Sequence, residues 1–120
     1  MHKKKFILGN INKPTGARGW LLGAFLDKNH SLYREDLEIG YMKLTPETKD
    51  KKHYHEKCDE YIIVIKGEMW QEVDGGLVKL KQGDFIYQPA GCVTELIKVP
   101  EYAEIVIIKT PSIPTDKIYV

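Results

Sequence analysis

Turn-forming residues divide the second half of the chain into short apolar segments, and this spacing limits the available folds more than any other feature. The breaks fall at Asp74-Gly75-Gly76, Gln82-Gly83-Asp84 and Pro89-Ala90-Gly91. Glycine, proline and aspartate favour tight turns, because they adopt or stabilise backbone conformations that other residues avoid. No long window shows helical periodicity, and the segments between the breaks are short for helices. Short strands separated by turns predict an all-β sandwich or barrel.

Two segments carry the clearest strand patterns. The run Tyr61–Ile65 is continuously apolar and mostly β-branched, which is typical of a strand buried on both faces. Leu37, Ile39 and Tyr41 alternate with Glu38 and Gly40, which is typical of a half-buried strand. We further expect a surface arm over 9–19, a strand over 20–26 in which Gly23 marks a bulge or a close approach, and a turn at 66–68. Further strands are expected over 69–73, 77–80, 85–87, 93–99 and 103–108, and a tail from Pro111 is expected to dock on the barrel or on a neighbouring subunit.

The size and charge of the chain exclude several classes of partner. Its 120 residues suffice for one domain with its own core, and the formal net charge of +1 favours neither nucleic acid nor membrane as partner. The basic cluster Lys3-Lys4-Lys5 is interpreted as a solvated end, and the polar residues after it argue against a signal peptide. Cys58 and Cys92 are too few for a disulfide framework, so we expect free thiols in a cytoplasmic protein.

Metal-ligating residue types gather between positions 53 and 60. His53 and His55 are one residue apart, so on an extended strand both side chains point to the same side. Glu60 follows five residues later. Two imidazoles and a carboxylate can form three corners of a site for Zn, Fe, Mn, Ni or Cu. The predicted metal ligands are therefore His53, His55 and Glu60.

Other side chains allow more than one interpretation. His30, in a turn, and His2, near the terminus, are expected to be exposed. Alternation along the strands makes Gln71 and Tyr87 candidates for inward-facing polar groups. No Ser-His-Asp or Cys-His arrangement and no phosphate-binding glycine loop is evident, and no general base is assigned. Five aromatic residues could line a ligand pocket, although aromatic residues in a small barrel more commonly pack in the core. They are Trp20, Tyr41, Tyr61, Trp70 and Tyr87.

These patterns resemble the two sequence motifs of the cupin superfamily. The first, Gly-x5-His-x-His-x3–4-Glu-x6-Gly, is matched by His53, His55, Glu60 and Gly67, with Glu47 in place of the opening glycine. The second, Gly-x5-Pro-x-Gly-x2-His-x3-Asn, is matched by Gly83, Pro89 and Gly91. The resemblance implies a double-stranded β-helix, or jelly-roll barrel, with a core over about 37–109 inside a single domain of residues 1–120.

The second motif departs from the pattern at its last two positions. Thr94 stands where cupins that bind metal have their fourth ligand, a histidine, and Lys98 stands at the asparagine position. Threonine is a poor ligand for a divalent transition metal. The site is therefore a three-ligand centre with open positions, a weakened centre or an empty one. Glu95, Cys92 and Cys58 are candidates to replace the missing ligand.

The resemblance leaves two classes of function open. One is a metal-dependent enzyme on a small substrate: an Fe(II) oxygenase, or an isomerase or lyase in which Zn, Mn or Ni acts as a Lewis acid. The alternative is a ligand-binding or sensor cupin with a weakened or empty metal site. Both imply a small-molecule partner, and the resemblance also implies a homodimer.

Overall fold

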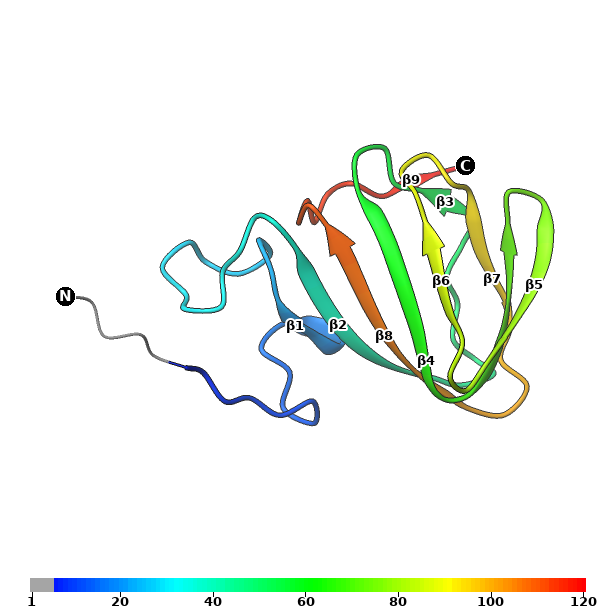
Figure 1. Ribbon diagram of the computed structural model, residues 1–120, viewed down its shortest axis with the longest axis horizontal. Coiled ribbons are helices and arrows are strands. Elements are labelled where there is room, and N and C mark those ends of the chain that lie inside the picture. The colour runs from blue at the N-terminus through cyan, green and yellow to red at the C-terminus, as the bar shows by residue number, and fades with distance from the viewer. Residues whose placement is uncertain (1–5) are drawn as a thin grey trace.

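The computed structural model describes residues 6–120, and strands account for almost all of its regular secondary structure (Figure 1). The predicted all-β class is therefore confirmed. His2 and Lys3-Lys4-Lys5 lie outside the described residues. The elements are the 3-10 turn η1 (Ala17–Gly19) and the strands β1 (Trp20–Leu22), β2 (Glu38–Leu44), β3 (His53–Tyr54), β4 (Asp59–Val73), β5 (Gly76–Lys81), β6 (Phe85–Gln88), β7 (Thr94–Lys98), β8 (Ala103–Thr110) and β9 (Ile118–Tyr119).

The long strand β4 joins the two halves of a curled sheet. The strand order is β1-β2-β8-β4-β7-β3-β9, and β5 and β6 pair with β4 outside this path. Residues 59–67 of β4 pair with β8, and residues 68–73 pair with β5. Figure 1 shows β2, β8 and β4 side by side, with β7, β3 and β9 beyond them. The curled sheet therefore has an interior face, which carries the core.

The predicted turn at Lys66-Gly67-Glu68 was wrong, because this stretch is a bend inside β4. Gly67 has a φ of 75°, and a Cβ at this position would lie 1.9 Å from the carbonyl oxygen of Tyr102. The register with β8 also shifts between Val64 and Lys66. Only glycine adopts this conformation at so close an approach, so β4 passes from one half of the sheet to the other without ending.

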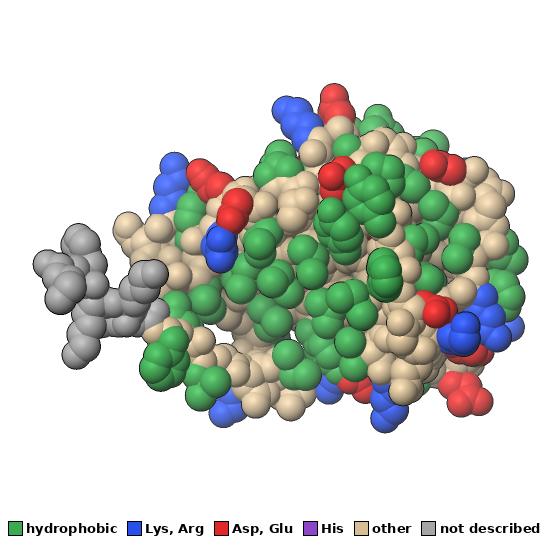
Figure 2. Space-filling model, in the orientation of Figure 1, with side chains coloured by type: hydrophobic (Ala, Val, Ile, Leu, Met, Phe, Trp, Pro, Cys, Tyr) green, Lys and Arg blue, Asp and Glu red, His purple; other side chains and the backbone are tan. Residues whose placement is uncertain are grey.

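Only one face of the Tyr61–Ile65 run lies in the core. Ile62 and Val64 are buried, whereas Ile65 is 47% exposed. The prediction of burial on both faces was wrong because the outward side chains are also apolar, so the sequence shows no alternation. Tyr61 stacks on Tyr87 of β6 at a centroid distance of 5.1 Å. Figure 2 shows apolar side chains gathered where Figure 1 places β2, β8 and β4.

The first strands differ from their predictions in length and orientation. The strand expected over 20–26 ends at Leu22, and its register irregularity lies between Trp20 and Leu22. In β2 the alternation predicted Glu38 on the polar face, yet Glu38 is only 3% exposed. The Trp20 ring packs so closely on Gly40 that a Cβ there would lie 2.8 Å from it. Glu38 therefore belongs to the interior face.

The tail returns to the sheet, in agreement with its predicted docking on the barrel. In β9, Ile118 pairs with Tyr54, and Tyr119 pairs with His53. The β-structure thus extends beyond the predicted core of 37–109, through β1 at one end and β9 at the other. Among residues 6–120, no helix is long and apolar enough to cross a membrane.

Candidate metal centre

A row of polar side chains crosses four neighbouring strands on the interior face. Glu38 of β2 pairs in register with Lys109 of β8, Lys109 with Glu60 of β4, and Glu60 with Gln88 of β6. Residues paired in this way have Cβ atoms about 5 Å apart on the same face of a sheet. Glu38, Glu60 and Gln88 are all buried. The row therefore brings two carboxylates and an ammonium group into the interior.

Both predicted histidine ligands are buried, and a backbone carbonyl orients each ring. His53 Nδ1 lies 2.6 Å from the Lys51 carbonyl oxygen, and His55 Nδ1 is bonded to the Asp116 carbonyl oxygen. A carbonyl only accepts hydrogen bonds, so each Nδ1 carries a proton, and in the neutral ring each Nε2 keeps its lone pair. The ring centroids are 5.2 Å apart. Histidines that bind metals are oriented by this kind of partner.

His55 and Glu60 provide two adjacent donor atoms. His55 Nε2 lies 3.5 Å from Glu60 Oε2, and it is buried with no hydrogen-bond partner among residues 6–120. Two ligands about 2.1 Å from one tetrahedral ion are separated by about 3.4 Å. The observed separation therefore fits two ligands of one ion. A buried polar atom without a partner is also costly, and a bound metal would remove that cost.

The charges around the site favour the metal-binding protonation states. Burial lowers the pKa of His53, so this ring is neutral near pH 7. Burial alone would raise the pKa of Glu60, but the close approach of His55 and the charge of Lys109 outweigh burial and lower it. Lys109 Nζ lies 3.9 Å from Glu60 Oε2. A metal binds neutral imidazoles and ionised carboxylates, and His53 and Glu60 are in these forms here.

The three predicted ligands do not yet surround a single point. Among residues 6–120, no three His, Cys, Asp or Glu side chains form a group that could hold a metal ion as they stand. His53 contacts the edge of the His55 ring, whereas His55 approaches Glu60. The donors thus fit a divalent metal in type, tautomer and charge, but only two of the three already have the spacing of one coordination sphere.

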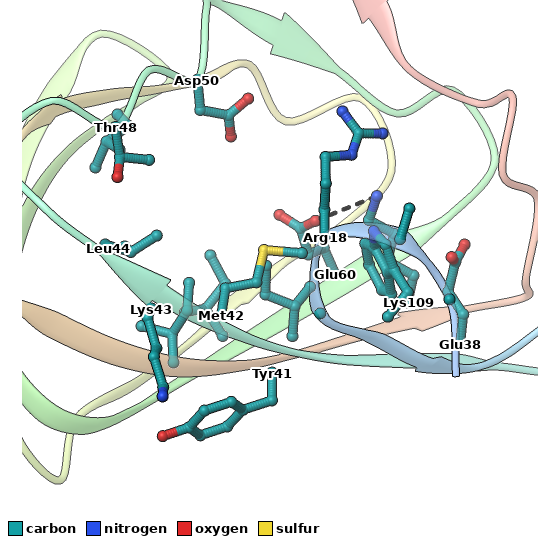
Figure 3. Close-up of a pocket in the computed structure, with 18 of the residues that line it drawn as sticks. Arg18, Glu38, Tyr41, Met42, Lys43, Leu44, Thr48, Asp50, Glu60 and Lys109 are labelled. Atoms are coloured by element: carbon teal, nitrogen blue, oxygen red, sulfur yellow. Dashed lines mark ion pairs between the residues drawn. The ribbon is translucent and has the colours of Figure 1, made fainter. Parts of the chain in front are cut away.

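A cavity of about 890 Å³ adjoins these residues, and a volume of this size is typical of small-molecule sites. His53, Glu60, Glu38 and Lys109 line it, and Arg18 of η1 also contributes to its wall. Figure 3 shows the Lys109–Glu60 ion pair in this cavity, together with Arg18 and Glu38. In the same view the lining residues Tyr41 and Lys43 point away from Glu60.

The two side chains predicted to be inward-facing polar groups, Gln71 and Tyr87, differ in their positions. Gln71 is buried and lines the cavity, and Gln88 Nε2 donates to its Oε1 at 3.0 Å. The prediction for Tyr87 was wrong: Tyr87 is 51% exposed, because the register of β6 turns its neighbour Gln88 inward. Of the aromatic candidates, Trp20 and Tyr41 line the cavity, and Tyr61 and Trp70 are half-buried outside it. His30 is exposed, as predicted.

None of the three candidate replacements for the fourth ligand lines the cavity. Thr94 is buried and pairs in register with His53, so it lies beside the candidate site. Glu95, Cys92 and Cys58 do not line the cavity. Burial and the neighbouring Asp116 raise the pKa of Cys58 to about 12, and burial and Asp74 raise the pKa of Cys92 to about 11. Neutral thiols are poor metal ligands and poor nucleophiles.

The tail residue Asp116 holds the segment between the histidines and Glu60. Its carboxylate accepts the backbone N–H groups of Glu56, Lys57 and Cys58 at 2.9, 2.8 and 3.0 Å. Burial alone would raise the pKa of Asp116, but these donors outweigh it and lower the pKa. Since the Asp116 carbonyl also accepts from His55, one residue fixes both the loop and a metal-ligand candidate.

Sequence reasoning missed four residues of the site: Glu38, Gln88, Lys109 and Asp116. A signal existed for two of them, because Glu38 and Lys109 are charged residues at the ends of apolar strands and share the face of the buried row. Asp116 is 58 residues from Cys58 in the chain, and no local sequence pattern predicts this contact.

Comparison with known proteins supports the predicted fold. A family model described as "Cupin domain" matches residues 40–97, which contain every position at which the chain matches the two motifs. The chain matches no curated protein sequence.

Solved structures of similar shape agree with this match. A cupin protein (BF4112) from Bacteroides fragilis has a TM-score of 0.58 at 15% identity, over 63% of this chain and 66% of that one. KdgF from Halomonas sp. has a TM-score of 0.62 at 20% identity, over 67% and 73% of the two chains. Oxalate decarboxylase from Bacillus subtilis has a TM-score of 0.63 at 22% identity, over 72% of this chain but only 24% of its own length. At these identities the likeness concerns the fold alone, and it confirms the double-stranded β-helix.

Proposed function

We propose that this chain, which belongs to the cupin superfamily, binds a divalent transition metal through His53, His55 and Glu60 and takes a small molecule in the adjoining cavity. One observation carries the proposal. Two neighbouring buried histidines have Nδ1 fixed by carbonyl groups, and the free Nε2 of one of them lies at ligand spacing from a carboxylate. Zn, Fe, Mn and Ni all suit such donors.

The same arrangement suits catalysis on the bound molecule. Three protein ligands leave coordination positions open, and a bound metal would supply Lewis-acid polarisation of a carbonyl or hydroxyl, or O₂ activation in the case of Fe(II). The chain's own residues would do the rest. Lys109 would attract a negatively charged group of the bound molecule, and Gln71, held by its hydrogen bond from Gln88, would orient a polar group. We therefore propose an isomerase, lyase or oxygenase activity.

A second candidate is a ligand-binding or sensor protein without turnover. It is favoured by Thr94 at the fourth-ligand position and by the incomplete approach of His53 to Glu60. The two candidates differ in one measurable respect, because only the enzyme converts its ligand. Loss of turnover in Glu60→Gln with retained ligand binding would support the enzyme, and binding without turnover in the wild-type protein would support the sensor.

The metal content of the protein tests the proposal directly. Protein purified without an affinity tag should hold near-stoichiometric metal by plasma mass spectrometry, and His53→Ala and Glu60→Gln should lose it. His30→Ala is the matched control, since it removes an exposed histidine that does not line the cavity. Metal-free wild-type protein that takes up no added metal, or variants with unchanged metal content, would contradict the proposal.

A further inference from the structure

The end of the polar row beyond Glu60 presents two groups that the metal site does not use. Glu38 is 3% exposed and lines the cavity, and its Oε1 has no hydrogen-bond partner among residues 6–120. Buried carboxylate oxygens without partners are uncommon, because each one costs the free energy of its lost hydration. This oxygen can therefore accept a hydrogen bond from a molecule in the cavity.

Lys109 is the second group. Its side chain is 15% exposed, and its ammonium lies 3.9 Å from Glu60 Oε2 and 5.0 Å from the centre of the Trp20 ring. Neither contact is a hydrogen bond, although an ammonium carries three donors. The Trp20 ring packs on Gly40 and closes one side, so the free donors face the cavity that Lys109 lines.

If Glu60 binds a metal, the positive charge around Lys109 would favour binding of an anion. The divalent ion would take the Glu60 charge that now lies beside the ammonium, and it would add positive charge a few ångströms away. Glu38, the register partner of Lys109, would then be the carboxyl group left to face it, and burial raises the pKa of Glu38. A second cation, Arg18, lines the same cavity from η1 and has a φ of 55°, a left-handed conformation that is unusual for a residue other than glycine. The next residue, Gly19, approaches the backbone of β2 so closely that a Cβ would lie 2.1 Å from the Tyr41 carbonyl oxygen. The arm is therefore anchored where it presents Arg18 to the cavity.

We propose that the cavity binds a short hydroxy acid, whose carboxylate pairs with Lys109 and whose hydroxyl group donates to Glu38. This inference rests on the proposed function, and it names the class of small molecule. Glu38 and Lys109 are register partners on adjacent strands, so their Cβ atoms are about 5 Å apart. A carboxylate and a hydroxyl separated by one to a few carbon atoms can reach both. An amino acid could also reach Glu38 through its ammonium, but that ammonium would lie beside Lys109 and the metal, so two like charges would oppose the one carboxyl group.

Isothermal titration of the full chain, with and without metal, tests this inference using matched probes. Malate is compared with succinate, malamide and aspartate, and glycolate with acetate, glycolamide and glycine. These sets remove the hydroxyl, remove the carboxylate charge, or replace the hydroxyl with an ammonium. We expect at least one hydroxy acid to bind at least tenfold more tightly than its amide and its amino acid, and more tightly than the acid without a hydroxyl.

Variants then assign the two contacts. Lys109→Met should weaken hydroxy-acid binding at least tenfold, Glu38→Met should abolish the preference over the acid without a hydroxyl, and Lys98→Met, which removes an exposed lysine outside the cavity, should change neither. Binding of the amide or amino acid as tightly as the hydroxy acid, absence of binding by both hydroxy acids, or an unchanged affinity in folded Lys109→Met would overturn the inference. The probe comparisons need no variant, so they decide the question even where Lys109→Met fails to fold.

Metal content measured on the same samples separates this inference from the proposed function. Discrimination between malate and malamide in protein that takes up no metal would support the hydroxy-acid site and defeat the metal site. Stoichiometric metal without discrimination would do the reverse.

Discussion

Removing the Asp116 side chain tests how the tail supports the candidate metal centre. In Asp116→Ala the N–H groups of Glu56, Lys57 and Cys58 lose their common acceptor. Cys58 is buried, so its N–H stays unsatisfied at a cost of about 2 kcal/mol. Glu56 and Lys57 are exposed, and water replaces part of their loss, at roughly 0.5 kcal/mol each. The expected destabilisation is about 3 kcal/mol.

Chemical denaturation and thermal unfolding both measure this change. For a chain of this size, 3 kcal/mol corresponds to a fall of about 12 °C in Tm. Asp116→Asn keeps one acceptor oxygen and should lose about half as much. Asp27→Ala is the control, because Asp27 lies in an exposed turn, and its Tm should stay within about 2 °C of wild type. A loss below about 1 kcal/mol in Asp116→Ala would refute the reasoning.

The pH dependence gives a second readout of the same contact. The pKa of Asp116 is lower in the folded protein than the ordinary value of 3.8, so its contribution to stability is complete above that value. The contribution is lost as the pH falls through the folded-state pKa. The difference in unfolding free energy between wild type and Asp116→Asn should therefore be constant near neutral pH and shrink below about pH 4. A difference that grows on acidification would contradict this sign.

Four further outcomes follow from the structure. Thr94→His should raise metal affinity at least tenfold, measured by competition with a chelator, while lowering the stability of the metal-free protein by about 1–3 kcal/mol because the larger side chain overfills a buried site. Gly67→Ala should cost at least about 3 kcal/mol or prevent folding, seen by circular dichroism, because its Cβ would lie 1.9 Å from a carbonyl oxygen. Cys58, with a pKa of about 12, should resist a thiol-specific chromogenic reagent at pH 8 until the protein is unfolded. Phe85→Lys, on the exposed apolar face, should give monomers in size-exclusion chromatography with light scattering if that face supports the predicted homodimer, and an unchanged mass would exclude the face.

The sequence allowed the fold to be predicted where local signals decide the structure. The turns around Gly75, Gly83 and Gly91 need left-handed glycines, and each lies where the composition placed a break. The spacing of His53 and His55 was enough to bring both rings to one side of the chain. Such features depend on the conformation of a few neighbouring residues, so a short window of sequence contains them.

The remaining site residues depend on register between distant strands, which no short window contains. Glu38 becomes an interior residue because β2 pairs with β8 so that Lys109 lies opposite it. In β2 the alternation indicated the wrong face as the core, and in β4 the apolar residues on both sides made either face acceptable. Tyr87 was misplaced for the same reason, because one residue of register exchanges it with Gln88.

The absence of the fourth histidine and the presence of Lys109 both affect which charge a ligand of the metal centre should carry. A fourth neutral imidazole at position 94 would fill a coordination position without changing the net charge of the centre, whereas Thr94 leaves that position to the ligand. A divalent ion with Glu60 as its one anionic ligand keeps one positive charge, and Lys109 adds a second nearby. Glu38, the register partner of Lys109, compensates it only in part, because burial raises the pKa of Glu38 and disfavours its charged form. Buried positive charge of this size needs compensation, because the interior solvates it poorly. Thr94 and Lys109 together therefore favour a small anion that coordinates the metal and pairs with Lys109, and a neutral ligand would leave the charge of the metal centre uncompensated.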